Sequence, residues 1–403
     1  MGHVQDRWWT VRDGKRVKAP QFGKGMRYKV RFPGPDGRER SKMFPDRQKG
    51  AADAFLHEIE NDKNKGTYLD PDAGKITFRD YTEKHWIDAR TFDESTREGV
   101  EFRLKLHVYP YFGDTELRLI QPSTIQAWER KLQQKGLAET YRRSIFANVS
   151  AIFTAAIDDE RLRKNPCNGK SVIKPRGEYP KIVPWSEKRV HAVRDKLGER
   201  YRVGVNLGAG CGLRQGEVFG FSPDDVDESE GVIHVLRQVK IVRGKMIFGP
   251  PKHGKSRDVP LAKSVADAIA THMDKFEPLP VTLPWGAPDG KLVTVPLLIY
   301  TRESKQLHRH SFNHYVWKSA LRDAGIETPG RAEGFHALRH FYASSLLEAG
   351  VSIRALAEYL GHADPAFTLR VYTHLMPASH ERARSAVDEV FSISVSRSQA
   401  QRA

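Results

Sequence analysis

The spacing of apolar residues changes along the chain and predicts two kinds of structure. Short strand-like runs occur at 7–11, 27–32 and 38–44, and the string PGPDG between the last two is typical of a turn. A helix is predicted from about 48 to 64. We therefore expect a small three-stranded sheet with one helix behind it over residues 1–66.

After residue 74 the pattern becomes helical. Apolar residues recur every three or four positions in four segments, which lie around 78–87, 100–108, 125–132 and 141–152. The SxxE string that starts at Ser95 and the SxxQ string that starts at Ser123 have the spacing of a capping box, which opens a helix. These patterns predict a four-helix unit over 75–170.

Beyond residue 183, helical and strand-like segments alternate. Helices are predicted at 186–197, 201–207, 262–275 and 310–324, and an amphipathic helix at 379–391. Strands are predicted at 232–235, 239–242 and 246–248, and again around Val259. The sequence thus predicts an α+β fold that is mostly helical, in three domains at 1–66, 75–170 and 183–391.

Positive charge is concentrated at the N-terminus. The 403 residues carry a formal charge of +16, and the first 49 hold fourteen Lys or Arg against five acids. Such a balance favours a polyanionic partner, and the strands of a small basic sheet can lie in a DNA groove. The alternative is a basic face that contacts only solvent.

Other features exclude several classes of protein. Cys167 and Cys211 are the only cysteines, and neither has a companion at the short spacing of zinc or redox motifs. No run of eighteen apolar residues occurs, and the N-terminus lacks the apolar segment of a signal peptide. We therefore expect an intracellular protein that neither enters a membrane nor is exported.

Four short strings in the last third of the chain contain residues suited to chemistry on a phosphate. In order they are GLRQGE from Gly212, PKHGKSRDVPL from Pro251, HALRH from His336, and LGH followed by TLRVYTH, which ends at His374. A single Arg or His in such a string is more often a helix cap or a surface ion pair. The ordered set of four is what carries the prediction.

This ordered set resembles the catalytic domain of the tyrosine recombinases, the phage integrase family. The resemblance implies six catalytic residues, which are Arg214, Lys252, His336, Arg339, His362 and Tyr372. Lys255 is the other lysine of the second string, and only the resemblance ranks it below Lys252. The string PAFTLRVYTH looks like integrases of actinobacterial phages and integrative elements.

The chemistry of these residue types agrees with the resemblance. Arg214 and Arg339 can hold the oxygens of a phosphodiester and neutralise the charge of its transition state. Tyr372 can attack phosphorus and form a phosphotyrosine, which conserves the bond energy, so neither ATP nor a metal or other cofactor is expected. Lys252 would protonate the leaving 5′ oxygen, and His336 would act as general base or proton relay.

The remaining candidates receive supporting roles. His362 is expected to hydrogen-bond a non-bridging oxygen of the phosphate. Glu217 is predicted to orient Arg214 or cap a helix, and His340 to support the catalytic residues from behind. Tyr359 is predicted to belong to the core and His374 to the surface.

The resemblance also implies partners and a biological role. It predicts an integrase that recombines double-stranded DNA attachment sites as a homotetramer, through a Holliday junction, in a bacterial cytoplasm. An arm-binding domain at 1–66 and a core-binding domain at 75–170 would grip the DNA, and the helix at 379–391 would dock on its own or a neighbouring protomer. An excision directionality factor and a host DNA-bending protein are the expected accessory proteins.

Two other functions remain open at this level. A topoisomerase with the same tyrosine chemistry would relax DNA without choosing sites, and it has no evident need for the basic N-terminal sheet. A repressor that kept the fold but lost catalysis would bind DNA in a sequence-specific way. The complete set of six residues argues against the repressor.

Overall fold

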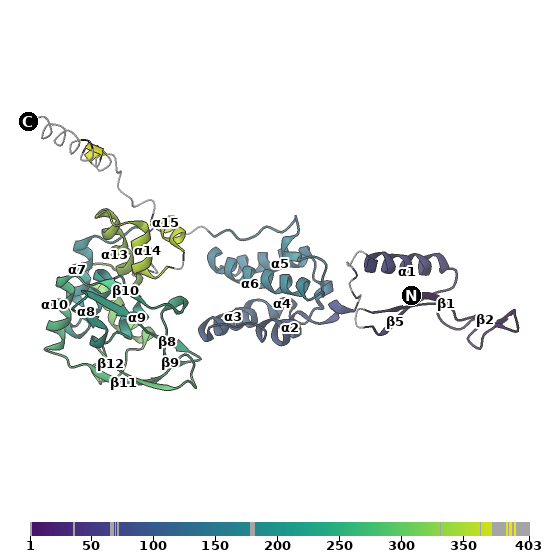
Figure 1. Ribbon diagram of the computed structural model, residues 1–403, viewed down its shortest axis with the longest axis horizontal. Coiled ribbons are helices and arrows are strands. Elements are labelled where there is room, and N and C mark those ends of the chain that lie inside the picture. The colour runs from purple at the N-terminus through teal and green to yellow at the C-terminus, as the bar shows by residue number, and fades with distance from the viewer. Residues whose placement is uncertain are drawn as a thin grey trace, which may run out of the picture. The chain divides into compact units, whose positions relative to one another are not determined.

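The computed structural model describes residues 2–34, 37–64, 68, 70, 72–177, 182–330, 332–362 and 364–372, together with 384–385, 387–388 and 391. The chain forms two compact units, Met1–Tyr179 and Pro180–Ala403 (Figure 1). The helix predicted at 379–391 lies largely outside the described residues, as does His374. No helix in the described part is long and apolar enough to span a bilayer.

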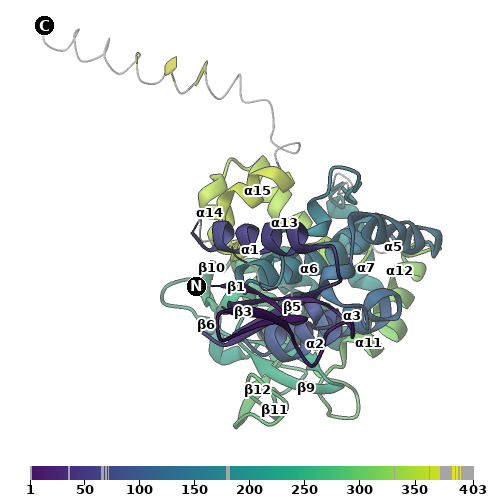
Figure 2. The same cartoon turned by 90° about the vertical axis from the view of Figure 1, so that its right-hand side faces the viewer.

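The first unit begins with an antiparallel sheet of three strands. Strand β4 (Tyr28–Pro33) lies between β1 (His3–Asp6) and β5 (Glu39–Phe44). Helix α1 (Lys49–Asn64) covers one face of this sheet, as both views show (Figures 1 and 2). Alternate residues of β4 point toward the helix and are buried, which is the period of two that a half-buried strand requires.

The strand predicted at 7–11 is confirmed in part, but it does not belong to the three-stranded sheet. Residues 7–8 form a bend, and Trp9–Arg12 is strand β2, which pairs with β3 (Lys15–Lys18) in a separate hairpin. Asp13 and Gly14 both have positive φ (48° and 73°), the geometry of the tight turn that an Asp-Gly pair favours. The Asp-Gly pair was the signal for this hairpin.

The rest of the first unit is the predicted set of helices around one apolar core. These elements are η1 (Ala73–Lys75), α2 (Phe78–Tyr81) with its π-helical continuation η2 (Thr82–Ile87), α3 (Glu94–His107), α4 (Tyr109–Phe112), η3 (Leu117–Leu119), α5 (Pro122–Gln134), α6 (Glu139–Asp158) and η4 (Pro166–Asn168). Phe78, Trp128 and Ile152, from three of the helices, are buried in the core.

The two predicted capping boxes are wrong, since both helices begin earlier. The cap of α3 is Asp93, whose carboxylate accepts a hydrogen bond from the Ser95 amide at 3.1 Å. Helix α5 follows Gln121, because Pro122 suits the first helical position, where its missing N–H costs nothing.

The second unit mixes helices with small antiparallel sheets, as predicted. Its helices are α7 (Glu187–Lys196), α8 (Glu199–Gly210), α9 (Gln215–Phe219), η5 (Pro223–Asp225), η6 (Lys252–Gly254), α10 (Lys263–Met273), α11 (Arg309–Ser311), η7 (Phe312–Trp317), α12 (Lys318–Asp323), α13 (His336–Glu348), α14 (Ile353–Leu360) and α15 (Pro365–Tyr372). Its strands are β6 (Val226–Asp227), β7 (Val232–Val235), β8 (Gln238–Val242), β9 (Lys245–Gly249), β10 (Arg257–Pro260), β11 (Leu279–Pro284) and β12 (Leu292–Leu297). Helices α13, α14 and α15 lie together at one end of this unit (Figures 1 and 2).

The hairpin β11–β12 was not predicted. Its strands contain three prolines, which argue against a central strand, but a two-stranded hairpin consists only of edges, where proline is tolerated. Val295 and Leu297 of β12 pack on Phe248 of β9, and the Gly286 amide donates to the Phe248 carbonyl at 2.8 Å. This hairpin therefore supports β8–β9, the hairpin that leads to Lys252.

Candidate active site

Arg214 is held in place at the start of a short helix. It caps α9, and its backbone amide donates to Glu217 Oε2 at 2.8 Å, while its guanidinium Nη1 donates to Glu217 Oε1, also at 2.8 Å. Gly212, two residues earlier, has φ +64°, and a Cβ there would lie 2.4 Å from the ring of Tyr342. Glu217 thus both caps the helix and orients Arg214, the two alternatives that the sequence left open.

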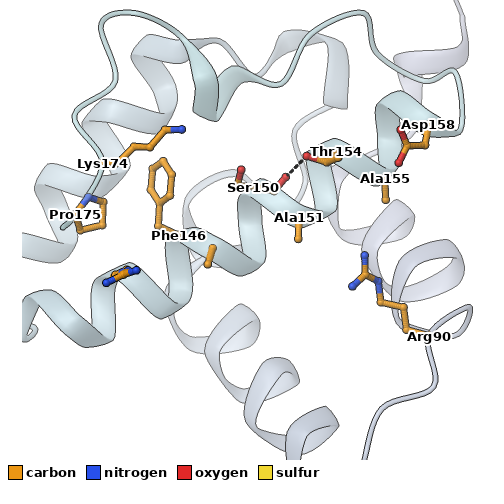
Figure 3. A pocket seen from close by; sticks show the side chains of 11 residues that line it. Arg90, Phe146, Ser150, Ala151, Thr154, Ala155, Asp158, Lys174 and Pro175 are labelled. Carbon is orange, nitrogen blue, oxygen red and sulfur yellow. Dashed lines mark hydrogen bonds between the residues drawn. The ribbon is translucent and has the colours of Figure 1, made fainter. Parts of the chain in front are cut away.

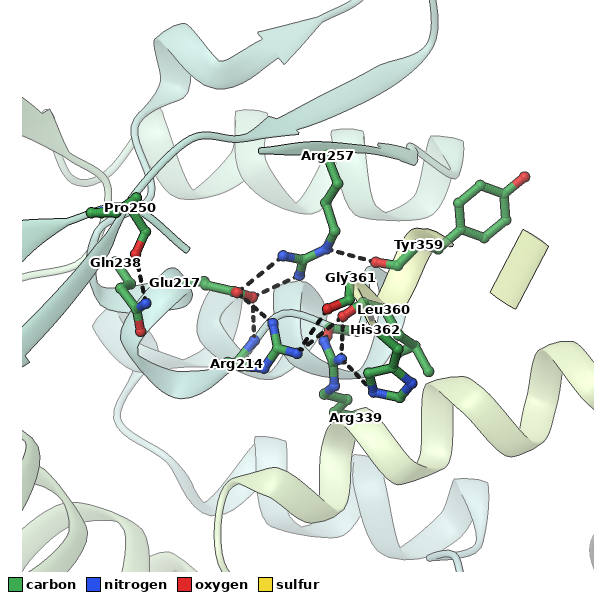
Figure 4. Close-up of polar contacts among 11 residues, drawn as sticks. Arg214, Glu217, Gln238, Pro250, Arg257, Arg339, Tyr359, Leu360, Gly361 and His362 are labelled. Atoms are coloured by element: carbon green, nitrogen blue, oxygen red, sulfur yellow. Dashed lines mark hydrogen bonds and ion pairs between the residues drawn. The ribbon is translucent and has the colours of Figure 1, made fainter. Parts of the chain in front are cut away.

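Glu217 binds a second arginine that sequence reasoning missed. Arg257 on β10 donates to both carboxylate oxygens of Glu217, at 3.0 and 2.7 Å, and its Nε donates to the carbonyl of Tyr359 at 2.7 Å (Figure 4). Burial alone would raise the pKa of Glu217, but the hydrogen bonds and charge of Arg257, with the charges of Arg214 and Arg339, lower it to about 2. The carboxylate is therefore ionised at neutral pH.

Arg339 on α13 is 1% exposed and meets Arg214 at the end of α14. Its Nη1 donates to the carbonyl of Gly212 at 2.7 Å, and its Nη2 donates to the carbonyl of Leu360, which also accepts from Arg214 Nη2 at 3.2 Å. The carbonyl end of a helix attracts cations, so α14 helps to hold two like charges together. The predicted pair of guanidiniums is thus brought to one point.

His362 follows directly after the left-handed cap of α14. Its Nε2 lies 3.1 Å from Arg339 Nη2, and its Nδ1 lies 2.7 Å from the hydroxyl of buried Thr368. Because a guanidinium only donates, Nε2 is the acceptor and Nδ1 carries the proton. Burial and the charge of Arg339 lower the pKa of His362, so its ring is neutral at pH 7.

Tyr372 ends α15 and is 2% exposed. Its hydroxyl oxygen lies 2.8 Å from Nδ1 of His340, which was expected only to support the site from behind. Burial raises the pKa of Tyr372 to about 12, against the opposing charges of Arg339 and Arg214. The candidate nucleophile is therefore protonated, enclosed and hydrogen-bonded.

His336 lies one helical turn before His340 on α13, with 4.7 Å between the two ring centres. His336 is exposed, yet desolvation by the surrounding protein and the charges of its neighbours, His340 and Arg339 first among them, lower its pKa. His336 thus lies beside the two arginines. Within the described residues, no hydrogen bond joins it to Tyr372.

Lys252 lies in the turn η6 between β9 and β10 and is exposed. Its charge is one of those that lower the pKa of His362, which places it near that histidine. Gln238 on β8 donates to the carbonyl of Pro250 at 2.7 Å and fixes the start of this turn (Figure 4).

A separate pocket lies in the first unit, along one face of α6 (Figure 3). Small side chains such as Ala151 and Thr154 line it, and Arg90, Arg143 and Lys174 bring positive charge to it. No cluster of His, Cys, Asp or Glu that could hold a metal ion occurs among the residues that the structure describes.

Comparisons with known proteins cover most of the chain. Residues 177–379 match the phage integrase family, and residues 78–170 match the phage integrase central domain. The chain is 27% identical over 378 residues to a tyrosine recombinase XerC-like protein of Caldanaerobacter subterraneus, an alignment that spans 87% of this chain and 92% of that protein. It is 26% identical over 304 residues to the integrase of Mycobacterium phage D29, spanning 74% of this chain and 75% of that protein.

Solved structures share the fold. The Tn1549 transposon integrase in complex with a circular intermediate DNA superposes with a TM-score of 0.66 at 19% identity, over 78% of this chain and 99% of that one. A lambda integrase tetramer bound to a Holliday junction gives a TM-score of 0.56 at 16% identity, over 87% and 92% of the two chains.

Proposed function

The chain belongs to the phage integrase family and is a tyrosine-type site-specific recombinase, and we propose that Arg214, Lys252, His336, Arg339, His362 and Tyr372 form its active site. The observation that carries this proposal is the meeting of Arg214 and Arg339 at the end of α14, next to His362. Its relatives are recombinases and integrases, so neither the repressor nor the topoisomerase is favoured.

Arg214 and Arg339 bind the scissile phosphate. Together with Arg257 and Glu217 they form a group of three guanidiniums and one carboxylate, which leaves a surplus of two positive charges for an anion. Guanidiniums form short, charge-assisted hydrogen bonds to phosphate oxygens and stabilise the charge that develops in the transition state. Glu217 serves this site by holding two of the arginines rather than by touching DNA.

Strand cleavage follows from an exchange of one ester bond for another. The Tyr372 hydroxyl gives its proton to a histidine of α13 as its oxygen bonds to phosphorus, the bond from phosphorus to the 5′ oxygen breaks, and Lys252 gives a proton to that oxygen. His336 and His362 contact the phosphate from the helical side. The 3′-phosphotyrosine keeps the energy of the broken ester, so a 5′ hydroxyl from a second duplex can reverse the reaction and complete strand exchange.

The N-terminal sheet is the proposed arm-binding domain. The hairpin β2–β3 extends beyond that sheet in Figure 1, and its exposed Arg12, Lys15 and Arg16 add to the basic surface. Asp6, at the end of β1, links the hairpin to the sheet. Its carboxylate forms ion pairs with Arg16 of β3 at 3.2 Å and with Arg27 at 2.9 Å. A fixed basic hairpin beside a groove-binding sheet would contact the phosphate backbone.

The helical part of the first unit is the proposed core-binding domain. The small side chains and the cations of the α6 pocket allow the close approach of a phosphate backbone. The lambda integrase structure is a tetramer on a Holliday junction, which supports a homotetramer of this chain on paired attachment sites. We further propose that the chain acts in the bacterial cytoplasm. An excision directionality factor and a host DNA-bending protein would be its accessory proteins.

A covalent trapping experiment tests the catalytic proposal. The purified chain is incubated, without metal or ATP, with a nicked duplex that spans the end of the element encoding it, and the products are denatured and separated. Wild type should give a DNA–protein adduct, while Tyr372→Phe should bind the same DNA without forming one. Tight binding by both proteins without an adduct from either would reject the active site proposed here.

A further inference from the structure

The described part of the structure gives the hydroxyl of Tyr372 one polar side-chain contact, and it is not the contact that the sequence predicted. Nδ1 of His340 lies 2.8 Å from the phenolic oxygen, although 32 residues separate the two in the chain. His340 is on α13 and Tyr372 is on α15, so the pair exists only when these helices are packed together. The rings are tilted by 59° with 5.8 Å between their centres, which directs the ring edge of His340 at the hydroxyl.

On the basis of the proposed function, we propose that His340 accepts the phenolic proton of Tyr372 as the tyrosine oxygen attacks phosphorus. This is the role that sequence reasoning assigned to His336. The same ring would return the proton when the 5′ hydroxyl displaces the tyrosine during rejoining. His340 thereby becomes a catalytic residue, because it touches the reacting oxygen itself.

A base is needed because the enclosed tyrosine does not ionise by itself. Burial raises the pKa of Tyr372 to about 12, so the phenolate is scarce at neutral pH. The proton must therefore leave while the bond between oxygen and phosphorus forms. A base in hydrogen-bond contact with that proton is the arrangement that general-base catalysis requires.

His340 is in the protonation state that this task needs. Burial, and then the charge of Arg339, lower its pKa to about 4, so the ring is neutral at pH 7 and Nδ1 can accept the hydroxyl proton. Among the described residues, His336 on α13 and Arg214 at the start of α9 are further charged or titratable groups near the pair. A phosphate bound to Arg214 and Arg339 opposes their charge, and this raises the basicity of His340 when substrate is present.

The step balances without any further reactant. The tyrosine oxygen forms its bond to phosphorus and passes its proton to His340 Nδ1. The bond from phosphorus to the 5′ oxygen breaks, and Lys252 protonates that oxygen. Rejoining reverses each transfer, so the enzyme returns to its starting state.

The test measures single-turnover adduct formation by the full chain on the nicked duplex at several pH values. His340→Ala removes the acceptor, whereas His340→Asn places an amide near the position of Nδ1, which can hold the hydroxyl but cannot take its proton. Both variants should cleave about 10²- to 10⁴-fold more slowly at pH 7, the usual contribution of a general base. Their rates should rise tenfold per pH unit as the phenolate becomes available, while the wild-type rate should depend less on pH.

A second substrate separates the base from the acid. When sulfur replaces the 5′ bridging oxygen, the leaving group needs no proton, so Lys252→Ala should recover while both His340 variants stay slow. Cleavage by His340→Asn at the wild-type rate, or recovery of the His340 variants on the sulfur substrate, would overturn the proposal. Failure of wild type to trap DNA would instead reject the proposed function. A melting temperature and a DNA affinity equal to those of wild type show that a variant has no folding defect.

Discussion

Replacing Glu217 by Gln should destabilise the catalytic unit, because this carboxylate is the one anion among three guanidiniums. Glu217 is 1% exposed, and its pKa falls from 4.5 to about 2 on folding. That difference corresponds to about 3 kcal/mol at pH 7, since one pKa unit equals about 1.4 kcal/mol. Removal of one partner from a buried ion pair typically costs about 3–5 kcal/mol, which agrees in size.

The loss of stability in Glu217→Gln should be measured by urea unfolding followed by near-ultraviolet circular dichroism. The stacked rings of Trp185 and Trp317, with 6.2 Å between centres and 3° between planes, report on the catalytic unit. Glu199→Gln is the matched control, because Glu199 forms an exposed ion pair with Lys275 and should give no resolvable change. Adduct formation by Glu217→Gln should fall as well, since Arg214 loses the contact that orients it.

The pH dependence gives the reasoning a second test. A carboxylate whose pKa is lower in the folded state stabilises the protein above the unfolded pKa, and the stabilisation disappears as pH falls through the folded value. The difference between wild type and Glu217→Gln should thus be complete above pH 4.5 and vanish near pH 2. Equal stability at pH 7, or a difference that persists at the lowest pH, would refute the role assigned to Glu217.

Three further predictions follow from the same contacts. Arg257→Lys keeps the charge but loses the bidentate contact with Glu217. Urea unfolding should therefore show lower stability, and single-turnover trapping should show a slower rate. Wild-type behaviour in both measurements would make Arg257 dispensable. Gly361→Ala should cost about 1–2 kcal/mol and slow cleavage, because Gly361 has φ +60° and a Cβ would lie 2.9 Å from Arg257; unchanged melting would contradict this. Changing both Arg12 and Lys15 to Ala should make the slope of log affinity against log salt concentration shallower by roughly 1.8, about 0.9 for each lost phosphate contact. A slope equal to that of wild type would mean that the hairpin does not touch DNA.

Local patterns were sufficient to predict most elements of the second unit, whereas contacts across the fold were not. Helices α7, α8 and α10 and the strands β7 to β10 follow from apolar spacing, and the four strings pointed to the residues that the fold brings to the end of α14. The contact of His340 with Tyr372 depends on how α15 packs on α13. That packing cannot be predicted from the strings HALRH and TLRVYTH. The sequence therefore identified the groups, but it named His336 as the base, one helical turn before the histidine that contacts Tyr372.

Arg257 shows a signal that was present but unused. In RDVP the residues at 257 and 259 point to the same side of β10, and both are buried. An arginine that shares the inward side of a strand with a valine must have a buried anion as partner, because an unpaired buried charge is too costly. Glu217 was the acid already suspected of orienting Arg214, so the two observations together could have predicted the shared carboxylate.

The same network holds the two arginines and Tyr372 in place without DNA. Arg214 and Arg339 donate to the neutral carbonyls of Gly212 and Leu360, and Tyr372 is enclosed with its proton in place. A phosphate oxygen is a charged acceptor and forms stronger hydrogen bonds with guanidiniums than a carbonyl does, so substrate can replace these contacts at a net gain. The protein thus holds its cations together with weak internal acceptors and one strong anion, Glu217, and the surplus of positive charge that remains is suited to binding a phosphate.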